Sequence, residues 1–110
     1  MVLPFLTSFC WFLGQIRYQR GQLELALDNF HKALEIERRC FGISHQTCAR
    51  TINEIGNIQL QLGNIEQVMQ CYTDALRIYR TAGVPDESLI IYGRSLWRFE
   101  LVHPPSAAAA

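Results

Sequence analysis

A stretch of 26 residues occurs twice in this chain, 42 residues apart, and this repeat limits the folds that the chain can adopt. Residues 13–38 and 55–80 are identical at nine of these 26 positions. Other pairs are conservative, such as Phe30 with Tyr72. Self-similarity at a fixed period of this size is typical of proteins built from stacked copies of one small unit. The sequence therefore predicts two copies of one structural unit.

The residue pattern within each copy predicts two helices joined by a tight turn. Gly21 and Gly63 stand where one apolar-periodic run stops and the next begins, and glycine closes a helix C-terminus without steric cost because it adopts positive φ angles. After each glycine, apolar residues recur at steps of three and four, which indicates a helix with one buried face. These residues are Leu23, Ala26, Leu27, Phe30, Ala33 and Leu34, and then Ile65, Val68, Met69, Tyr72, Ala75 and Leu76. The predicted unit is a helical hairpin.

The same residues resemble the tetratricopeptide pattern of Leu-Gly, Gly, Ala, aromatic and Ala-Leu. The matching residues are Leu13, Gly14, Gly21, Ala26, Phe30, Ala33 and Leu34 in the first copy, and Ile55, Gly56, Gly63, Tyr72, Ala75 and Leu76 in the second. The chain departs from the pattern at Arg17 and Gln59, where an aromatic residue is usual. The 42-residue period and the linker with Phe41-Gly42 and His45 are similar to the longer repeats of kinesin light chains. The resemblance implies an all-α fold, in which antiparallel hairpins stack as a right-handed α-solenoid with a concave groove.

This resemblance covers roughly residues 7–100 and implies about two repeats followed by a capping helix. The expected segments are an apolar stub at 1–6, repeat 1 at about 7–41, repeat 2 at about 45–83, a capping helix at about 86–100 and a disordered tail at 101–110. The tail contains Pro104-Pro105 and has too little apolar content to remain folded.

Two local details of the helices are also predicted. The first helix is expected to start near Thr7, with Phe9, Phe12 and Ile16 facing its partner helix. Ser44 is the expected N-cap of the third helix, because a serine hydroxyl accepts a hydrogen bond from a free backbone amide. An export signal or anchor is the alternative reading of residues 1–13, but the run has no positively charged start, no cleavage site and too few apolar residues to span a bilayer.

Charge and residue patterns argue against several functional classes. Ten basic and ten acidic residues give a net charge of zero, and without a basic stripe we expect no nucleic-acid partner. Cys40, His45 and Cys48 flank one linker, but no fourth ligand is evident, so neither a metal site nor a cofactor is expected. The histidines are scattered and suggest no catalytic residue, which predicts that the chain is not an enzyme. Unpaired cysteines fit a reducing compartment and a cytoplasmic location.

The function that remains is protein binding, and the tetratricopeptide resemblance implies where a ligand would lie. The expected groove residues are Gln15 and Tyr18 in the first helix, beside Ser8, Trp11 and Phe12, and Arg50, Asn53, Glu54, Asn57 and Gln61 in the third. Steps of three and four place the five residues of the third helix on one face. The leading hypothesis is a kinesin light chain-like scaffold that binds a peptide or a partner protein without contacting a membrane. The alternative is a structural spacer, or a self-associating segment of a longer solenoid, in which these residues are a solvated helix face.

The repeat also yields a test of the hairpin register. Ala75 is expected at the crossing of two helices, where a larger side chain has no space, and overpacking of this kind costs about 1–3 kcal/mol. We predict that Ala75→Leu lowers the free energy of unfolding by this amount, measured by circular dichroism during thermal unfolding. A melting curve that matches the wild type would show that the assigned register is wrong.

Overall fold

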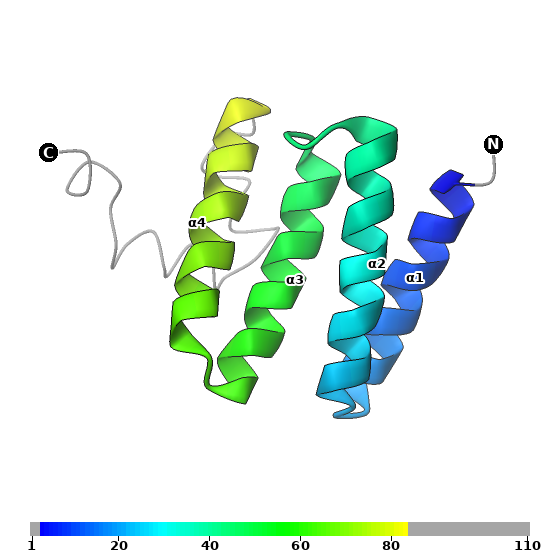
Figure 1. Cartoon of the computed structure of the whole chain (residues 1–110), viewed down its shortest axis with the longest axis vertical. Coiled ribbons are helices and arrows are strands. Elements are labelled where there is room, and N and C mark those ends of the chain that lie inside the picture. Colours follow the sequence, from blue (N-terminus) through cyan, green and yellow to red (C-terminus); the bar gives the residue numbers. More distant parts are fainter. Residues whose placement is uncertain (1–2, 84–110) are drawn as a thin grey trace, which may run out of the picture.

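The structure, a computed structural model, describes residues 3–83 as four helices joined by short turns. The helices are α1 (Leu3–Gln19), α2 (Leu23–Phe41), α3 (Gln46–Leu62) and α4 (Ile65–Thr81). They pack in chain order as two antiparallel hairpins, α1–α2 and α3–α4, and α2 packs against α3 to join them (Figure 1). The all-α prediction of about two stacked hairpins is confirmed. The expected capping helix and tail lie outside the described residues.

Glycine closes the first helix of each hairpin, as the repeat predicted. Gly21 and Gly63 have φ angles of 78° and 81°. In the first hairpin the Gly21 amide donates to the Tyr18 carbonyl, and the Gln22 amide donates to the Arg17 carbonyl. The second hairpin repeats both bonds, and this pair of bonds satisfies carbonyls at the helix end that otherwise lack a partner.

Each hairpin closes on a contact between a glycine and an aromatic ring. Phe30 of α2 lies against Gly14 of α1, and Tyr72 of α4 lies against Gly56 of α3. Both rings are buried. A Cβ atom added at Gly56 would lie 2.6 Å from the Tyr72 ring, whereas one at Gly14 would lie 3.1 Å from the Phe30 ring. The absence of a side chain at these glycines therefore sets how closely the two helices approach.

A polar contact lies within the interface between the hairpins. Glu37 of α2 is 1% exposed, and its carboxylate accepts a hydrogen bond of 2.5 Å from the hydroxyl of Thr51 of α3. Apolar side chains from both hairpins, including Leu34 and Ile52, form one continuous core around this level of the stack. Burial raises the pKa of the Glu37 carboxyl, and the Thr51 hydrogen bond and the Arg50 charge oppose this effect only in part.

The orientation of α1 differs from the prediction. The helix begins at Leu3 rather than near Thr7. Phe9, Phe12 and Ile16 are 64%, 63% and 48% exposed, so they do not face α2. The face against α2 consists of small residues, namely Thr7, Cys10 and Gly14, which are all buried. Small side chains allow the closer approach that Phe30 requires, and this turns the bulky residues outward.

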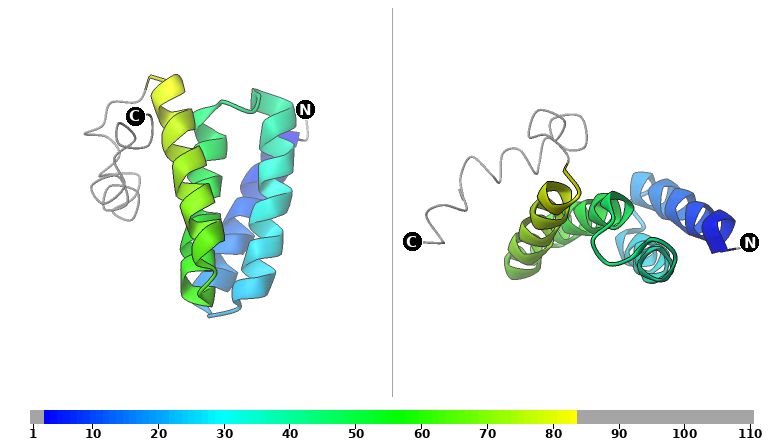
Figure 2. Two further views of the ribbon diagram at one scale, coloured as in Figure 1. Left: turned by 60° about the vertical axis from the view of Figure 1, so that its left-hand side comes forward. Right: turned by 90° about the horizontal axis from the view of Figure 1, so that it is seen from above.

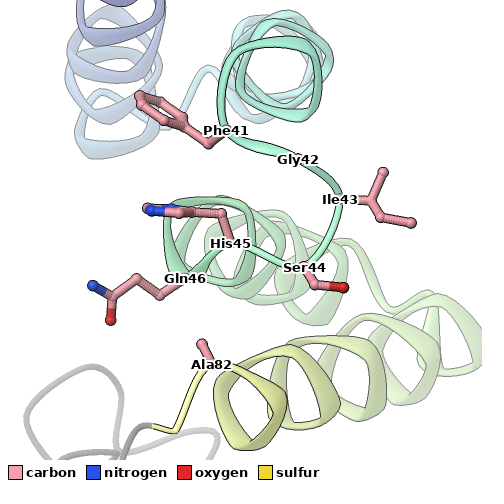
Figure 3. A pocket seen from close by; sticks show the side chains of 7 residues that line it. All are labelled: Phe41, Gly42, Ile43, Ser44, His45, Gln46 and Ala82. Carbon is pink, nitrogen blue, oxygen red and sulfur yellow. The ribbon is translucent and has the colours of Figure 1, made fainter.

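The predicted N-cap of α3 is also wrong. His45, not Ser44, occupies the cap position, and its Nδ1 accepts a hydrogen bond of 3.2 Å from the Thr47 amide. The imidazole also stacks on the ring of Phe41, with 5.0 Å between centroids, whereas Ile43 and Ser44 point away from this pair (Figure 3). Stacking on Phe41 holds the histidine where its ring nitrogen replaces a serine hydroxyl as the acceptor.

The difference between the two glycine contacts gives a prediction for stability. Gly56→Ala forces Cβ into a ring that is buried and that donates a hydrogen bond to Asn57, so the ring has little freedom to move. Because the added Cβ would lie 2.6 Å from the ring, we expect an overpacking cost in the upper part of the range of about 1–3 kcal/mol. This cost outweighs the roughly 1 kcal/mol that alanine gains over glycine within a helix. The matched control, Gly14→Ala, should lose less. Thermal unfolding measures both variants, and a Gly56→Ala protein as stable as the wild type would contradict the packing seen here.

The buried carboxyl predicts a dependence of stability on pH. Because the folded state raises the pKa of Glu37, its carboxyl stabilises the fold most below the ordinary glutamate pKa, and this contribution is lost as the pH rises through the raised value. Glu37→Gln removes the charge but keeps an acceptor for Thr51. Relative to wild type, this variant should therefore gain stability between pH 4 and pH 7.

The control for this experiment is Glu35→Gln, which removes an equal charge from an exposed ion pair with Arg39. Its stability relative to wild type should not rise between pH 4 and pH 7, because an exposed pair contributes little. Chemical denaturation at both pH values measures the differences. A Glu37→Gln variant with the same pH dependence as Glu35→Gln would show that the Glu37 pKa is not raised by folding.

Candidate functional site

The residues expected to line a groove lie on α1 and α3, the first helices of the two hairpins. Seen from above, α1 and α3 lie along one side of the stack, with α2 on the other side (Figure 2). The backbones of α1 and α3 approach each other less closely than those of α1 and α2. Long side chains bridge the space between them.

Three side-chain contacts connect α1 with α3. The guanidinium of Arg50 lies 4.4 Å above the centroid of the Trp11 ring. Gln15 hydrogen-bonds to the Glu54 carboxyl. Near the ends of both helices, the side-chain amide of Gln61 donates a 2.7 Å hydrogen bond to the Tyr18 hydroxyl. We call these six residues the α1–α3 row: Trp11, Gln15, Tyr18, Arg50, Glu54 and Gln61.

Exposure varies along the α1–α3 row. Arg50 and Gln61 are exposed, whereas Gln15, Tyr18 and Glu54 are half-buried. A small hollow of about 190 Å³ adjoins Arg50 at the start of α3. Gln46, Thr47 and Tyr79 form the rest of its lining. The row therefore presents one accessible positive charge beside a hollow, followed by amide and carboxyl groups.

Burial and neighbouring charge shift two ionisable groups in the row. Burial raises the pKa of the Glu54 carboxyl, and the Gln15 hydrogen bond and the Arg50 charge lower it in part. Burial also raises the pKa of the Tyr18 hydroxyl, the negative charge of Glu54 raises it further, and the hydrogen bond from Gln61 acts in the opposite direction. Both groups have hydrogen-bonding partners within the row, so these bonds connect α1 with α3.

Two of the seven expected groove residues do not belong to this row. Asn53 is only 1% exposed, so the expectation that its side chain lines a groove is wrong for this arrangement of helices. The reason is that α3 is covered by α2, by α4 and by the side chains of α1, which buries more than one face of the helix. Asn57 is half-buried and accepts a hydrogen bond from the Tyr72 hydroxyl of α4, so it lies toward its own hairpin partner.

Trp11 and Phe12, which the sequence placed beside Gln15 and Tyr18, lie on different faces of α1 in the structure. Trp11 lies in the row, where its ring also meets Phe30 edge-on at 5.9 Å. Phe12 is largely exposed on a different face of α1. The spacing of Trp11, Gln15 and Tyr18 at steps of four and three is the signal in the sequence that places them together. Nothing in the spacing indicates that Arg50 would cover the Trp11 ring.

A second hollow, of about 550 Å³, lies beside the α2–α3 linker and is bordered by Phe41, His45 and Ala82 (Figure 3). Cys48, near this linker, donates from its thiol to the Gly42 carbonyl. Within residues 3–83, no group of three or more His, Cys, Asp or Glu side chains is arranged to hold a metal ion. In the same part of the chain, no helix is long and apolar enough to cross a membrane.

Comparison with known proteins agrees with the repeat and the hairpin geometry. A search of curated proteins found no match. A family model described as tetratricopeptide repeat matches residues 6–81, which is more than half of the chain and includes all four helices almost entirely. Proteins with these repeats generally mediate interactions between proteins. The chain belongs to the tetratricopeptide repeat family.

Proposed function

We propose that this chain is a non-catalytic interaction module that binds an extended peptide, or an extended segment of a partner protein, along the α1–α3 row. The observation that carries the proposal is that side chains from two separate helices lie along one line. Arg50, near the start of α3, is the exposed arginine in this line. Hydrogen-bonding groups from both hairpins would then contact one ligand. Binding would join the repeats as well as hold the peptide.

The contacts within the row are compatible with exchange for a ligand. The bond between Gln61 and Tyr18 is exposed to solvent. A hydrogen bond of this kind contributes about 0.5–1.5 kcal/mol net, so replacing it with a bond to a peptide amide or carbonyl changes the free energy little. The stabilisation would come from contacts made in addition, above all from an acidic group of the ligand at Arg50.

The 42-residue period and the Phe41–His45 linker support a kinesin light chain-like subtype and, with it, a cytoplasmic scaffold. The His45 imidazole caps α3 and stacks on Phe41, so this linker fixes the angle between hairpins. A fixed angle would keep the α1–α3 row straight enough for an extended ligand.

A structural spacer is the second candidate. It is favoured by the observation that the row residues already have partners within the chain. In that case the row would serve to hold α1 against α3, and replacing its residues would alter stability without affecting any binding. The two candidates therefore differ in a measurable way.

Peptide selection followed by calorimetry tests the proposal. A peptide selected from a random displayed library against the folded chain should contain an acidic residue. Arg50→Gln should weaken its binding by about tenfold or more, because a charge-assisted hydrogen bond contributes about 1.5–3 kcal/mol. Gln61→Ala should weaken it less.

The control is Arg77→Gln on α4, an exposed arginine whose only described ion pair is with Asp74. This variant has the same charge change away from the row and should bind as wild type does. Equal affinity of wild type and Arg50→Gln would remove the row from the binding site. If no peptide is selected, and the row variants change only the melting temperature, the spacer function is supported instead.

A further inference from the structure

The face of α1 opposite α2 carries a line of large apolar side chains that nothing in the described chain covers. We call it the α1 stripe, formed by Phe5, Phe9, Phe12 and Ile16. Their side chains are 80%, 64%, 63% and 48% exposed. Single exposed apolar residues are ordinary on a protein surface, but a contiguous patch of this kind marks an interaction surface.

The internal repeat indicates what kind of surface this is. The residues 42 positions after Phe9 and Ile16 are Thr51 and Ile58 of α3, and both are fully buried. Thr51 is covered by α2, where it hydrogen-bonds to Glu37. The counterparts of Phe5 and Phe12 are Thr47 and Glu54, which are half-buried. At two of its four positions this face of the repeated unit is thus fully covered in the second hairpin, while in the first hairpin all four positions are exposed.

Spacing and charge narrow the choice of partner. The stripe residues are separated by steps of four, three and four, which is the spacing of the seam between two paired helices. Residues 3–16 of α1 contain no charged side chain. An uncharged surface can meet a copy of itself without repulsion, whereas adsorption to an anionic lipid surface usually relies on basic residues beside the apolar face.

We propose that the α1 stripe is a self-association surface, which binds the α1 stripe of a second copy of this chain. With roughly 200 Å² for each large side chain, the exposed fractions leave roughly 500 Å² of apolar surface per copy. If all of this surface were covered, two copies would bury roughly 1,000 Å², which is the minimum for a specific interface and predicts a weak dimer. The pairing is isologous, so it closes as a dimer and does not continue into a filament.

The other helix that a second copy could offer is α4, which corresponds to α2 in the repeat. Only Ile65 and Met69 of its equivalent face are exposed, at 56% and 41%. Leu76 and Tyr79, which correspond to Leu34 and Glu37, are already buried. α4 thus presents half of a packing face, whereas α1 presents a complete one along most of its length.

The two α1 helices would run antiparallel. This arrangement places Phe9 of one copy against Phe12 of the other at the centre, and Phe5 against Ile16 at each end. It also keeps the basic C-terminal ends of the helices, with Arg17 and Arg20, at opposite ends of the interface, whereas a parallel pair would bring them together. Opposed helix dipoles favour the same orientation.

Sedimentation velocity of the full chain at about 1 to 100 µM tests the proposal. Wild type should change from monomer to dimer over this range. Phe9→Glu and Phe12→Glu each place like charges at the centre of the pair and should weaken dimerisation by about 100-fold or more. Because both residues are exposed, circular dichroism should show unchanged helix content.

The matched control is Ile43→Glu, which makes the same kind of change at a 71% exposed residue in the α2–α3 linker. It should dimerise as wild type does. A monomeric wild type at 100 µM would overturn the proposal, as would a Phe9→Glu variant that still associates. A wild type that remains monomeric alone but binds vesicles of anionic phospholipid would overturn it in favour of a lipid partner.

Disulfide trapping tests the orientation. Phe9→Cys and Phe12→Cys proteins are prepared separately with Cys40 and Cys71 replaced by serine, and they are then mixed and oxidised. An antiparallel pair should give mainly the mixed dimer joined through positions 9 and 12. A predominance of dimers joined through two copies of position 9 would overturn the antiparallel arrangement. The proposed peptide-binding row lies on another face of α1, but Phe12 meets Trp11 of the row edge-on, with 5.5 Å between ring centroids. The Phe9→Glu variant is therefore the one that distinguishes failure of this proposal from failure of the proposed function.

Discussion

The close contact of a glycine with an aromatic ring is the constraint on which the rest of this structure depends. Gly14 and Gly56 leave space for Phe30 and Tyr72, and the same contact occurs once in each hairpin. A side chain at Gly56 would push α3 and α4 apart at the level of the core. Because the helices of each hairpin approach so closely, Ala33 and Ala75 are fully buried, and Phe9, Phe12 and Ile16 of α1 turn outward.

The interface between the two hairpins differs from the interface within each hairpin, because it includes a buried acidic group. The carboxyl of Glu37 accepts a bond from Thr51 in a layer that is otherwise apolar. Such a pair contributes less to stability than apolar packing, but it restricts how one hairpin can be placed on the other, because an unpaired buried carboxylate is unfavourable. Together with the stacking of His45 on Phe41, this hydrogen-bonded pair fixes the position of α3 relative to α2. The alignment of α3 with α1 follows from that position.

α1 has three distinct faces, and this division would allow the two proposed functions to coexist on one helix. Small residues pack against α2, Trp11, Gln15 and Tyr18 contact α3, and the α1 stripe faces away from both. A ligand along the α1–α3 row and a second copy on the stripe would contact separate sides of α1. A dimer of this kind would present two rows, and a bivalent partner would then bind more tightly than either row alone allows.

The sequence by itself determined the repeated unit. Spacing of apolar residues and the glycines at positions 21 and 63 indicated the hairpins and their turns, since these depend on local backbone geometry and on one periodic face for each helix. The tertiary structure decided which faces are covered. A helix with two neighbours has more than one buried side, so Asn53 on α3 is inaccessible although its spacing matched that of Arg50. Likewise, the apolar face of α1 is the exposed one, because close packing of the hairpin selects the smallest side chains for the contact and not the most apolar.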